Sequence, residues 1–270
     1  MYKRQIWTRA ANLNTENYYN DSIRLLSMIV MSGNWWAPAA TTNTSPTITD
    51  IAAQSIGVNS ATSAIAFTVG DAETAAGSLT LTKASSNTTL VPLANIVFGG
   101  SGASRTVTVT PAANQIGTAT ITVTVSDGTL TASDTFTVEV TATPLQAWRL
   151  QYFGLAGNTG NAADLADPDK DGLANIAEFT LNSDPTTSGL LPLNVAREGN
   201  DLTLTYTRRK SALGEITISP LSANAPNGPW SSTGVTEQIL NDNGILQQVK
   251  ARVPINGALQ KFFRLQFTRP

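Results

Sequence analysis

Cysteine and histidine are both absent from the 270 residues of the chain. Their absence excludes thiol nucleophiles, disulfide bonds, zinc sites of the thiolate and imidazole type, and catalytic triads that rely on imidazole. Among the common hydrolytic chemistries, a pair of carboxylates is what remains open. Functional chemistry in this chain is therefore expected to rest on carboxylates.

Charged side chains are scarce as well. They make up 13% of the chain, about half of the usual share, and the net charge is −2. Small and polar residues such as Thr, Ser and Asn take their place, a composition typical of β-rich extracellular proteins. Since the chain carries no strong field of one sign, we expect no nucleic-acid partner and no binding to an anionic membrane. The apolar run from Leu25 to Met31 is too short to cross a bilayer, which needs about 20 residues.

The first segment, residues 1–37, differs from the rest because its apolar residues recur at helical spacing. These residues are Tyr18, Tyr19, Ile23, Leu26, Ile29 and Val30. The strings Tyr18–Leu26 and Ser32–Trp35 resemble the closing helix of (α/α)6-barrel glycoside hydrolases such as family 8. This resemblance implies that residues 1–37 are the helical remnant of an upstream domain. An export signal, with a basic start, an apolar run and Ala37-Pro38-Ala39, is the alternative.

Residues 38–48 contain two prolines among small polar residues, which predicts a linker. In residues 49–142, apolar residues alternate with polar ones, most clearly from Ala119 to Val125, and the turn signal Asp127-Gly128 follows. Short strands at this spacing predict a β-sandwich. The phrases Phe67–Thr74 and Gly117–Gly128 resemble immunoglobulin-like or cadherin-like repeats of bacterial surface and secreted proteins.

Residues 143–186 switch to a helix, a loop and a second helix. The loop matches the twelve-residue pattern D-x-[DN]-x-[DN]-G-x5-E at every position, with Gly172 at the sharp turn. The predicted metal ligands are Asp167, Asp169, Asp171, Leu173 through its carbonyl oxygen, Asn175 and Glu178.

The pattern predicts a Ca²⁺ site, because calcium takes six to eight oxygen ligands at about 2.3–2.6 Å. Alternate residues of a tightly curled loop point inward together, and Glu178 closes the shell from the first turn of the exit helix. Four carboxylates repel one another without a cation, so folding of this segment is expected to depend on the ion. Asn158, Asn161, Asp164 and Asp184 are candidates for additional ligands.

The segment from Trp148 to Pro185, with this loop at its centre, resembles the dockerin-like or thrombospondin type 3-like calcium units near the C-termini of large secreted bacterial proteins. The resemblance implies a structural rather than a regulatory calcium, and a β domain often follows such units. No second copy of the loop is visible, whereas signalling EF-hands and cellulosomal dockerins use two. Residues 187–270 return to alternating strands, with Asn243-Gly244 as a hairpin signal, and predict a C-terminal antiparallel β domain.

Weaker candidates concern other residues. A cadherin-like calcium site between domains would use Asp71, Glu73 and Asp127, although residues in such a pattern more often serve turns. Tryptophans able to stack on sugar rings, or to fill a core, are Trp35, Trp36, Trp148 and Trp230. The carboxylate pairs to consider for glycoside hydrolysis are Glu215 with Glu237, and Asp201 with Asp242, although the sequence cannot place them at a catalytic separation.

We therefore expect a mainly β protein: an N-terminal helix, an immunoglobulin-like sandwich, a short helical connector with a calcium loop, and a C-terminal antiparallel β domain. Its predicted role is that of a non-catalytic, calcium-stabilised spacer or accessory region of an exported bacterial protein, secreted or held at the cell surface. Attachment to a polysaccharide-degrading enzyme is the favoured context. The alternatives are a carbohydrate-binding module and a calcium-dependent adhesion module.

Overall fold

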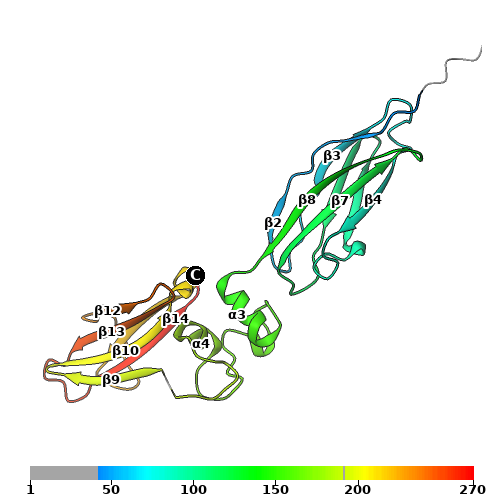
Figure 1. Cartoon of the computed structure of the whole chain (residues 1–270). Helices are drawn as coiled ribbons and strands as arrows, with labels where there is room; N and C mark the ends of the chain where they lie inside the picture. The colour runs from blue at the N-terminus through cyan, green and yellow to red at the C-terminus, as the bar shows by residue number, and fades with distance from the viewer. Residues whose placement is uncertain (1–41, 191) are drawn as a thin grey trace, which may run out of the picture. The chain divides into compact units, whose positions relative to one another are not determined.

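The computed structural model describes residues 42–190 and 192–270 (Figure 1), so the predicted N-terminal helix and most of the predicted linker lie outside the described residues. The described part of the chain is built mainly of strands, and the predicted fold class is confirmed. Two α-helices and three short 3-10 turns interrupt the strands of the described residues. None of the helices in the described ranges is long and apolar enough to span a membrane.

The first group of strands forms a sandwich of two four-stranded sheets, with strand orders β1-β3-β6-β5 and β2-β8-β7-β4. All pairs are antiparallel except β2 with β8, the first and last strands of one sheet, which run parallel. This closed arrangement of short strands is the one expected of an immunoglobulin-like domain. The strands are β1 (Thr47–Ile48), β2 (Gln54–Gly57), β3 (Ile65–Gly70), β4 (Thr80–Ser85), β5 (Ile96–Ser101), β6 (Ser104–Val109), β7 (Gly117–Ser126) and β8 (Thr131–Thr141), with a 3-10 turn, η1 (Leu93–Asn95), before β5.

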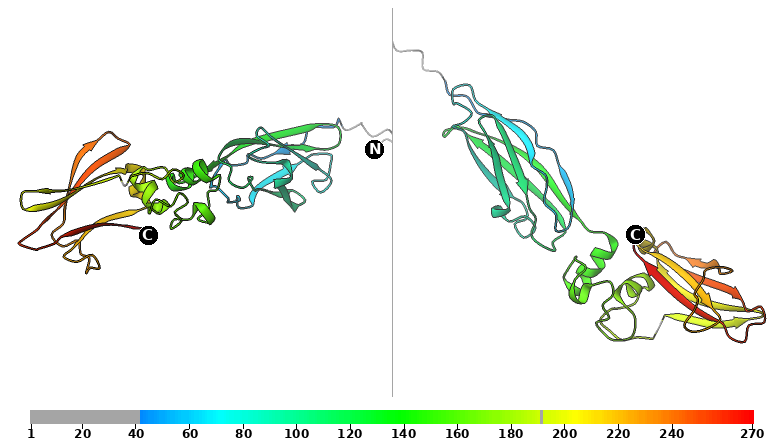
Figure 2. Two further views of the ribbon diagram at one scale, coloured as in Figure 1. Left: turned by 90° about the horizontal axis from the view of Figure 1, so that it is seen from below. Right: turned by 180° about the vertical axis from the view of Figure 1, so that it is seen from behind.

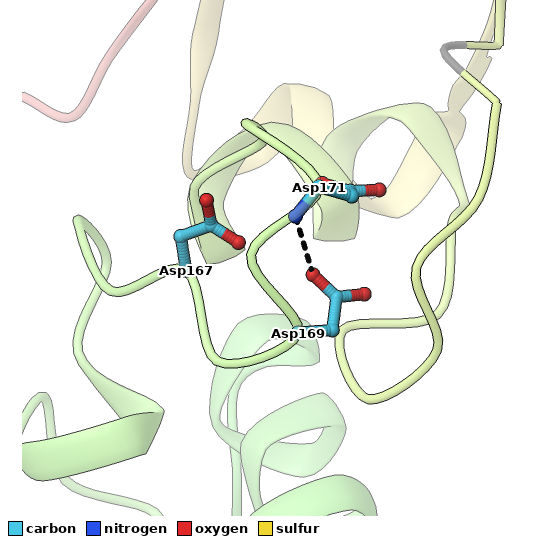
Figure 3. A group of neighbouring side chains, drawn as sticks. All are labelled: Asp167, Asp169 and Asp171. Carbon is cyan, nitrogen blue, oxygen red and sulfur yellow. Dashed lines mark hydrogen bonds between the residues drawn. The ribbon is translucent and has the colours of Figure 1, made fainter.

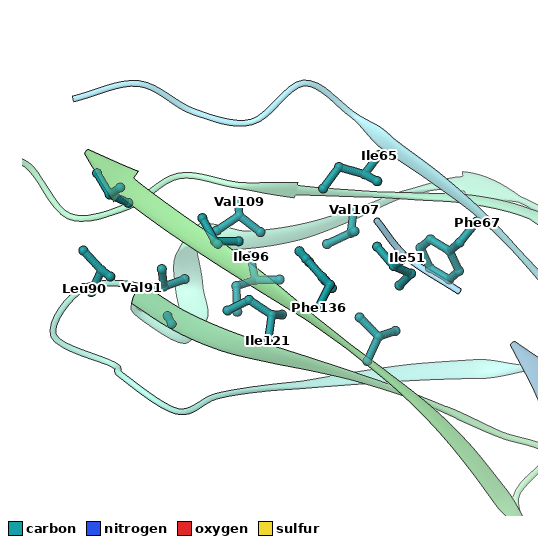
Figure 4. Close-up of a cluster of buried hydrophobic side chains, with 14 of the residues drawn as sticks. Ile51, Ile65, Phe67, Leu90, Val91, Ile96, Val107, Val109, Ile121 and Phe136 are labelled. Atoms are coloured by element: carbon teal, nitrogen blue, oxygen red, sulfur yellow. The ribbon is translucent and has the colours of Figure 1, made fainter. Parts of the chain in front are cut away.

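The alternating residues of these strands form the sandwich core, in which side chains of both sheets point toward one another (Figure 4). On β7 every second residue from Ala119 to Val125 is at most 1% exposed, as the alternation predicts. The turn at Asp127-Gly128 joins β7 to β8 in register, with Ile121 opposite Phe136. The short strands β1 and β2 were not predicted, and β1 lies at the end of the segment expected to be linker.

Helix α3 (Pro144–Phe153) follows the sandwich and is capped at both ends. The Thr143 side chain accepts a hydrogen bond from the Gln146 amide, and Gln146 reaches back to the Thr143 amide, which is a capping box. Gly154 ends the helix in the left-handed conformation, at φ 68°. A 3-10 turn, η2 (Gly160–Ala162), leads to the loop before helix α4 (Asn175–Leu181).

The C-terminal strands form a four-stranded sheet of order β12-β13-β10-β9 and a two-stranded sheet of β11 and β14 (Figure 2, yellow to red). All of their pairings are antiparallel, as predicted. The turn at Asn243-Gly244 joins β12 to β13, again as predicted. The elements are β9 (Leu193–Glu198), β10 (Asp201–Arg209), η3 (Lys210–Gly214), β11 (Thr217–Ala223), β12 (Thr236–Asp242), β13 (Leu246–Pro254) and β14 (Phe262–Thr268).

The helices do not form a separate layer with a core of their own. One buried cluster combines helix residues with residues that follow β10: Leu145, Trp148, Ile176, Phe179, Ala212 and Ile216, with Phe267 of β14 packed against them. Leu181, at the end of α4, lies in the cluster between the two C-terminal sheets. The predicted connector, residues 143–186, and the predicted C-terminal domain, residues 187–270, therefore share a hydrophobic core.

Candidate metal centre

The loop between η2 and α4 brings three aspartates together. One carboxylate oxygen from each of Asp167, Asp169 and Asp171 lies within 4.8 Å of the others, and all three side chains are half-buried (Figure 3). Gly172, at φ 92°, allows the chain to turn sharply after the third aspartate, a conformation that other residues rarely adopt. The loop thus brings three of the six predicted ligands close together, and the binding of a metal ion by this set stays a prediction.

Backbone hydrogen bonds fix one oxygen of each aspartate. Asp167 Oδ2 accepts from the Gly172 amide at 3.0 Å, and Asp169 Oδ1 accepts from the Asp171 amide at 3.2 Å. Asp171 Oδ1 accepts from the Leu173 amide at 2.9 Å. The other oxygens of Asp167 and Asp169 are buried and have no hydrogen-bond partner among the described residues. Backbone amides therefore fix the conformation of the loop, while one carboxylate oxygen of Asp167 and one of Asp169 lack a hydrogen-bond donor.

Helix α4 contributes Asn175 and Glu178, whose side chains are 1% and 0% exposed. Asn175 Nδ2 donates to the carbonyl oxygens of Asn161 and Ala163, both at 2.7 Å, which ties the η2 turn to the start of the helix. The Asn175 Oδ1 atom and both Glu178 carboxylate oxygens are buried without a partner among the described residues. An unpartnered buried acceptor costs free energy, so these atoms call for a positively charged group.

The electrostatics point in the same direction. Burial, and after it the charges of Asp169, Asp171 and Asp167 in that order of effect, together raise the pKa of Glu178 from 4.5 to about 7, while the nearby Ser183 hydroxyl opposes the shift. Burial, together with the neighbouring charge of Asp171, also raises the pKa of Asp169, although the Asp171 amide opposes the shift. The carboxylates of the loop and of α4 therefore interact electrostatically. In the absence of a cation, repulsion between their charges disfavours the state in which all of them are ionised.

These residues can hold a hard divalent cation, since every unsatisfied atom is an oxygen acceptor. Leu173 lies in the loop as predicted, and its amide binds Asp171; the ligand role of its carbonyl oxygen stays a prediction. Asp169 and Asp171 also hold the segment that follows α4. The Ser188 hydroxyl donates to the Asp169 carbonyl oxygen at 2.6 Å, and the Gly189 amide donates to Asp171 Oδ2 at 3.4 Å.

The residues considered as additional ligands have other partners. Asp164 pairs with Arg149 and with Arg269, and Asn158 donates to the Asp164 carboxylate at 3.1 Å. Asp184 accepts from the hydroxyl and the amide of Thr186, and these hydrogen bonds lower its pKa. Asn161 takes part through its carbonyl oxygen, which accepts from Asn175.

One buried polar residue near the site, Arg149, was not predicted from sequence. Arg149 of α3 is 2% exposed, forms an ion pair with Asp164, and donates to the Ala156 carbonyl oxygen at 3.4 Å. The Asp164 carbonyl oxygen in turn accepts from the Ile176 amide of α4 at 3.0 Å. Arg149 thus braces the chain three residues before the first aspartate. The available signal was an arginine on the apolar side of a short helix, next to Trp148.

The weaker calcium candidates serve turns. Asp71 Oδ1 accepts from the amides of Glu73 and Thr74 at 3.0 and 2.6 Å. Asp127 Oδ1 accepts from the amides of Thr129 and Leu130 at 2.6 and 2.7 Å. Within residues 42–190 and 192–270, the aspartates of the loop form the one group of three or more potential metal ligands at close range.

The two tryptophans of the described ranges differ in burial. Trp148 is 3% exposed and packs edge-on against Phe153 and Phe179. Trp230 is half-buried, with the Arg264 guanidinium 4.9 Å from the ring centroid. Every aromatic side chain of the described residues is buried or half-buried, so an exposed row of aromatics for stacking on sugars is not found there. Trp35 and Trp36 lie outside the described residues.

Three of the four carboxylates considered for glycoside hydrolysis are engaged in structural contacts. Glu215 accepts from Thr143 Oγ1 at 2.7 Å and from the Leu145 amide at 2.9 Å. Glu237 accepts from the Tyr206 hydroxyl, and Asp242 pairs with Lys210 at 3.0 Å. Hydrogen bonds from Gln247, from the Gly244 amide and from Lys210 lower the pKa of Asp242 to about 2, so this group stays ionised and is no general acid.

No protein-family model matches the chain. A β-glucanase of Niallia circulans is 64% identical over 31 residues, which cover 12% of this chain and 8% of the enzyme. The chain thus spans less than a tenth of the length of this curated relative.

Among solved structures, titin M4 matches 37% of this chain and 100% of its own, at 18% identity and a TM-score of 0.29. The three-domain titin fragment I67–I69 matches 84% of this chain and 66% of its own, at 8% identity and a TM-score of 0.36. At such values the likeness carries no functional argument. The immunoglobulin-like assignment rests on the strand order and core of β1 to β8.

Proposed function

We propose that the segment from Asp167 to Glu178 binds one structural Ca²⁺. The observation that supports this most directly is a set of five buried acceptor atoms without a donor among the described residues. They are Asp167 Oδ1, Asp169 Oδ2, Asn175 Oδ1, Glu178 Oε1 and Glu178 Oε2. A bound cation offsets the free-energy cost of burying all of these acceptors. Without a cation, buried carboxylates lower that cost by taking up protons.

Calcium is the cation that fits this donor set best. All candidate ligands are oxygen atoms, and the chain has neither the thiolates nor the imidazoles that zinc and copper prefer. Magnesium demands a smaller, near-octahedral shell and retains several waters, whereas calcium accepts a flexible shell of carboxylate, amide and carbonyl oxygens. In this proposal Asp167, Asp169 and Asp171 supply ligands from the loop, Leu173 its carbonyl oxygen, and Glu178 a bidentate carboxylate.

For the whole chain we propose a non-catalytic, calcium-stabilised accessory region of an exported bacterial protein. The immunoglobulin-like sandwich supports a spacer role, since its buried residues serve packing and its carboxylates Asp71 and Asp127 serve turns. The short identity with a β-glucanase supports attachment to a polysaccharide-degrading enzyme. The engagement of Glu215, Glu237 and Asp242 in structural contacts supports the non-catalytic assignment.

Isothermal titration calorimetry of the intact chain with calcium tests the metal site. We expect one bound ion per chain for the natural sequence. The double variant Asp169→Ala with Glu178→Ala is expected to lose this binding, because it removes one ligand from the loop and the carboxylate that closes the shell from α4. Magnesium is expected to bind more weakly than calcium.

A matched control is Asp50→Ala, which removes an exposed aspartate outside the loop and should bind calcium like the natural chain. Folding of the double variant is checked by far-ultraviolet circular dichroism, to which the strands of the sandwich contribute regardless of the loop. Absence of binding to the natural chain up to millimolar calcium would rule out the calcium proposal.

A further inference from the structure

We infer that the calcium site controls folding of the helices together with the C-terminal β domain, residues 143–270, and leaves the sandwich, residues 45–142, to fold by itself. This inference rests on the proposed calcium site and extends its effect from a loop to more than a hundred residues. The inference depends on the contacts that α4, which carries Asn175 and Glu178, makes with the C-terminal strands.

The apolar face of α4 is a part of the C-terminal core. Phe179 is 1% exposed and Ile176 8% exposed, and both lie in the cluster that contains Ala212 and Ile216. Leu181 reaches the second cluster, where it joins Leu204 of β10. Since well-packed cores tolerate little displacement, α4 cannot rearrange without opening the packing between the two C-terminal sheets.

Polar contacts join the same parts. Arg209, at the end of β10, donates from Nε to the Phe179 carbonyl oxygen at 3.1 Å, and its guanidinium lies 5.4 Å from the Phe179 ring centroid. Arg269, which follows β14, pairs with Asp164 at 3.0 Å. The Glu215 carboxylate, after η3, caps the start of α3. The connector is thus tied to several places in the C-terminal domain.

The predicted metal ligands lie on α4 itself and in the loop that precedes it. Glu178 precedes Phe179 directly and is fully buried, and the charges of the three aspartates of the loop act on its carboxylate, although the close group of potential ligands comprises the aspartates alone. Without a cation, the repulsion between these groups favours their return to water, which requires α4 to leave its place. Because α4 also carries core residues, the free energy of calcium binding is expected to stabilise the C-terminal strands as well as the loop.

The sandwich has a core that lacks this connection to the metal ligands. Its cluster draws on residues from Ile51 to Val140, and from the connector it includes Ala156 with Leu150 packed against it. The Ala156 amide donates to Asn114 Oδ1 at 3.0 Å. Neither Ala156 nor Leu150 belongs to the predicted ligand set. Removal of the ion is therefore expected to release the contacts of these two residues and to leave the core residues of the sandwich, from Ile51 to Val140, packed against one another.

Hydrogen exchange followed by mass spectrometry on the intact chain, with saturating calcium and after chelation, tests the inference. At free calcium about 100 times the Kd, linkage predicts that chelation accelerates global exchange of the coupled unit about hundredfold. We expect this acceleration in peptides from β10, β13 and β14, and no change in peptides from β7 and β8. The double variant Asp169→Ala with Glu178→Ala, in calcium, should exchange like the chelated natural chain, and Asp50→Ala should not.

The outcomes separate the inference from the proposal on which it rests. Acceleration confined to residues 158–190, with calorimetric binding intact, would overturn the inference and leave the calcium site standing. Acceleration that includes β7 and β8 would overturn the separation of the sandwich. Absence of calcium binding by calorimetry would remove the calcium site itself.

Discussion

At the scale of single residues, Glu178 is the most constrained group of the candidate site. It is fully buried, its oxygens are without a geometric hydrogen bond among the described residues, and the charges of three aspartates act on it. A buried carboxylate in this position has two ways to become stable, namely protonation or coordination of a cation. The proton and the metal ion therefore compete for the same atoms.

This competition predicts an opposite pH dependence with and without calcium. The pKa of Glu178 is raised from 4.5 to about 7 in the ion-free fold. A raised pKa stabilises the ion-free fold below pH 4.5, and this contribution is lost as pH rises through 7, a cost on the order of 3 kcal/mol by pH 8. Calcium binding should instead tighten over the same range, because the ion displaces a proton. Urea unfolding in calcium-free buffer, and calcium titrations at pH 5 and pH 8, measure the two trends.

Glu178→Gln is the matched variant for this prediction, since it keeps the shape of the side chain and removes its titration. In calcium-free buffer, the stability of the variant should depend less steeply on pH than that of the natural chain. Equal pH dependence of the two proteins would show that Glu178 is not the group responsible.

Sequence reasoning reached Glu178 and the aspartates because a metal loop is a local pattern. It missed Arg149, whose partner Asp164 lies 15 residues along the chain. A single arginine in a short helix has the same appearance in sequence whether it is solvated or buried. Only the fold, which turns the chain back after η2, places Asp164 beside the Arg149 guanidinium. The carboxylate then offsets the free-energy cost of burying the arginine charge.

At the scale of elements, helix α3 depends on a residue far away in sequence. Its first turn receives the Thr143 side chain and, in addition, the Glu215 carboxylate, which accepts from the Leu145 amide and from Thr143 Oγ1. A carboxylate at a helix N-terminus satisfies free amides and interacts favourably with the helix dipole.

Glu215→Ala is therefore expected to destabilise residues 143–270 by about 1 kcal/mol, the usual effect of removing a helix cap. Glu139→Ala, which removes an exposed glutamate of β8, is the matched control and should be nearly neutral. Denaturant unfolding followed by tryptophan fluorescence measures the difference, since Trp148 lies on α3. Equal stability of the two variants would show that the cap contributes nothing.

The elements that sequence predicted well are those with strict alternation. The strands β7 and β8, and the turn at Asp127-Gly128 between them, follow directly from the pleat and from turn chemistry. The strands β1 and β2 have weak local signals, because Gln54–Gly57 contains one large apolar residue and gains its place by pairing with β8. Their formation depends on a neighbouring strand that local patterns cannot supply.

At the scale of the whole molecule, the described residues contain one core within the sandwich and two neighbouring cores in residues 143–270. Sequence periodicity located the apolar residues but not their partners. Leu145 and Trp148 pack with Ala212 and Ile216, more than sixty residues away. The inferred dependence of the terminal strands on the metal loop follows from this contact between residues distant in sequence. Composition and spacing report local patterns, and they therefore indicated only a connector in residues 143–186.

Separate cores predict separate responses to mutation. Phe136 of β8 is 3% exposed in the sandwich core, so Phe136→Ala is expected to destabilise the sandwich by about 3–5 kcal/mol through lost burial and a cavity. Because Phe136 shares no packing cluster with α4, the calcium affinity of the variant should equal that of the natural chain. Calorimetric melting with saturating calcium should show the sandwich transition at lower temperature and the calcium-dependent transition unmoved. If the variant instead binds calcium several-fold more weakly, the sandwich and the metal site are energetically coupled, and the ion acts on the whole described chain.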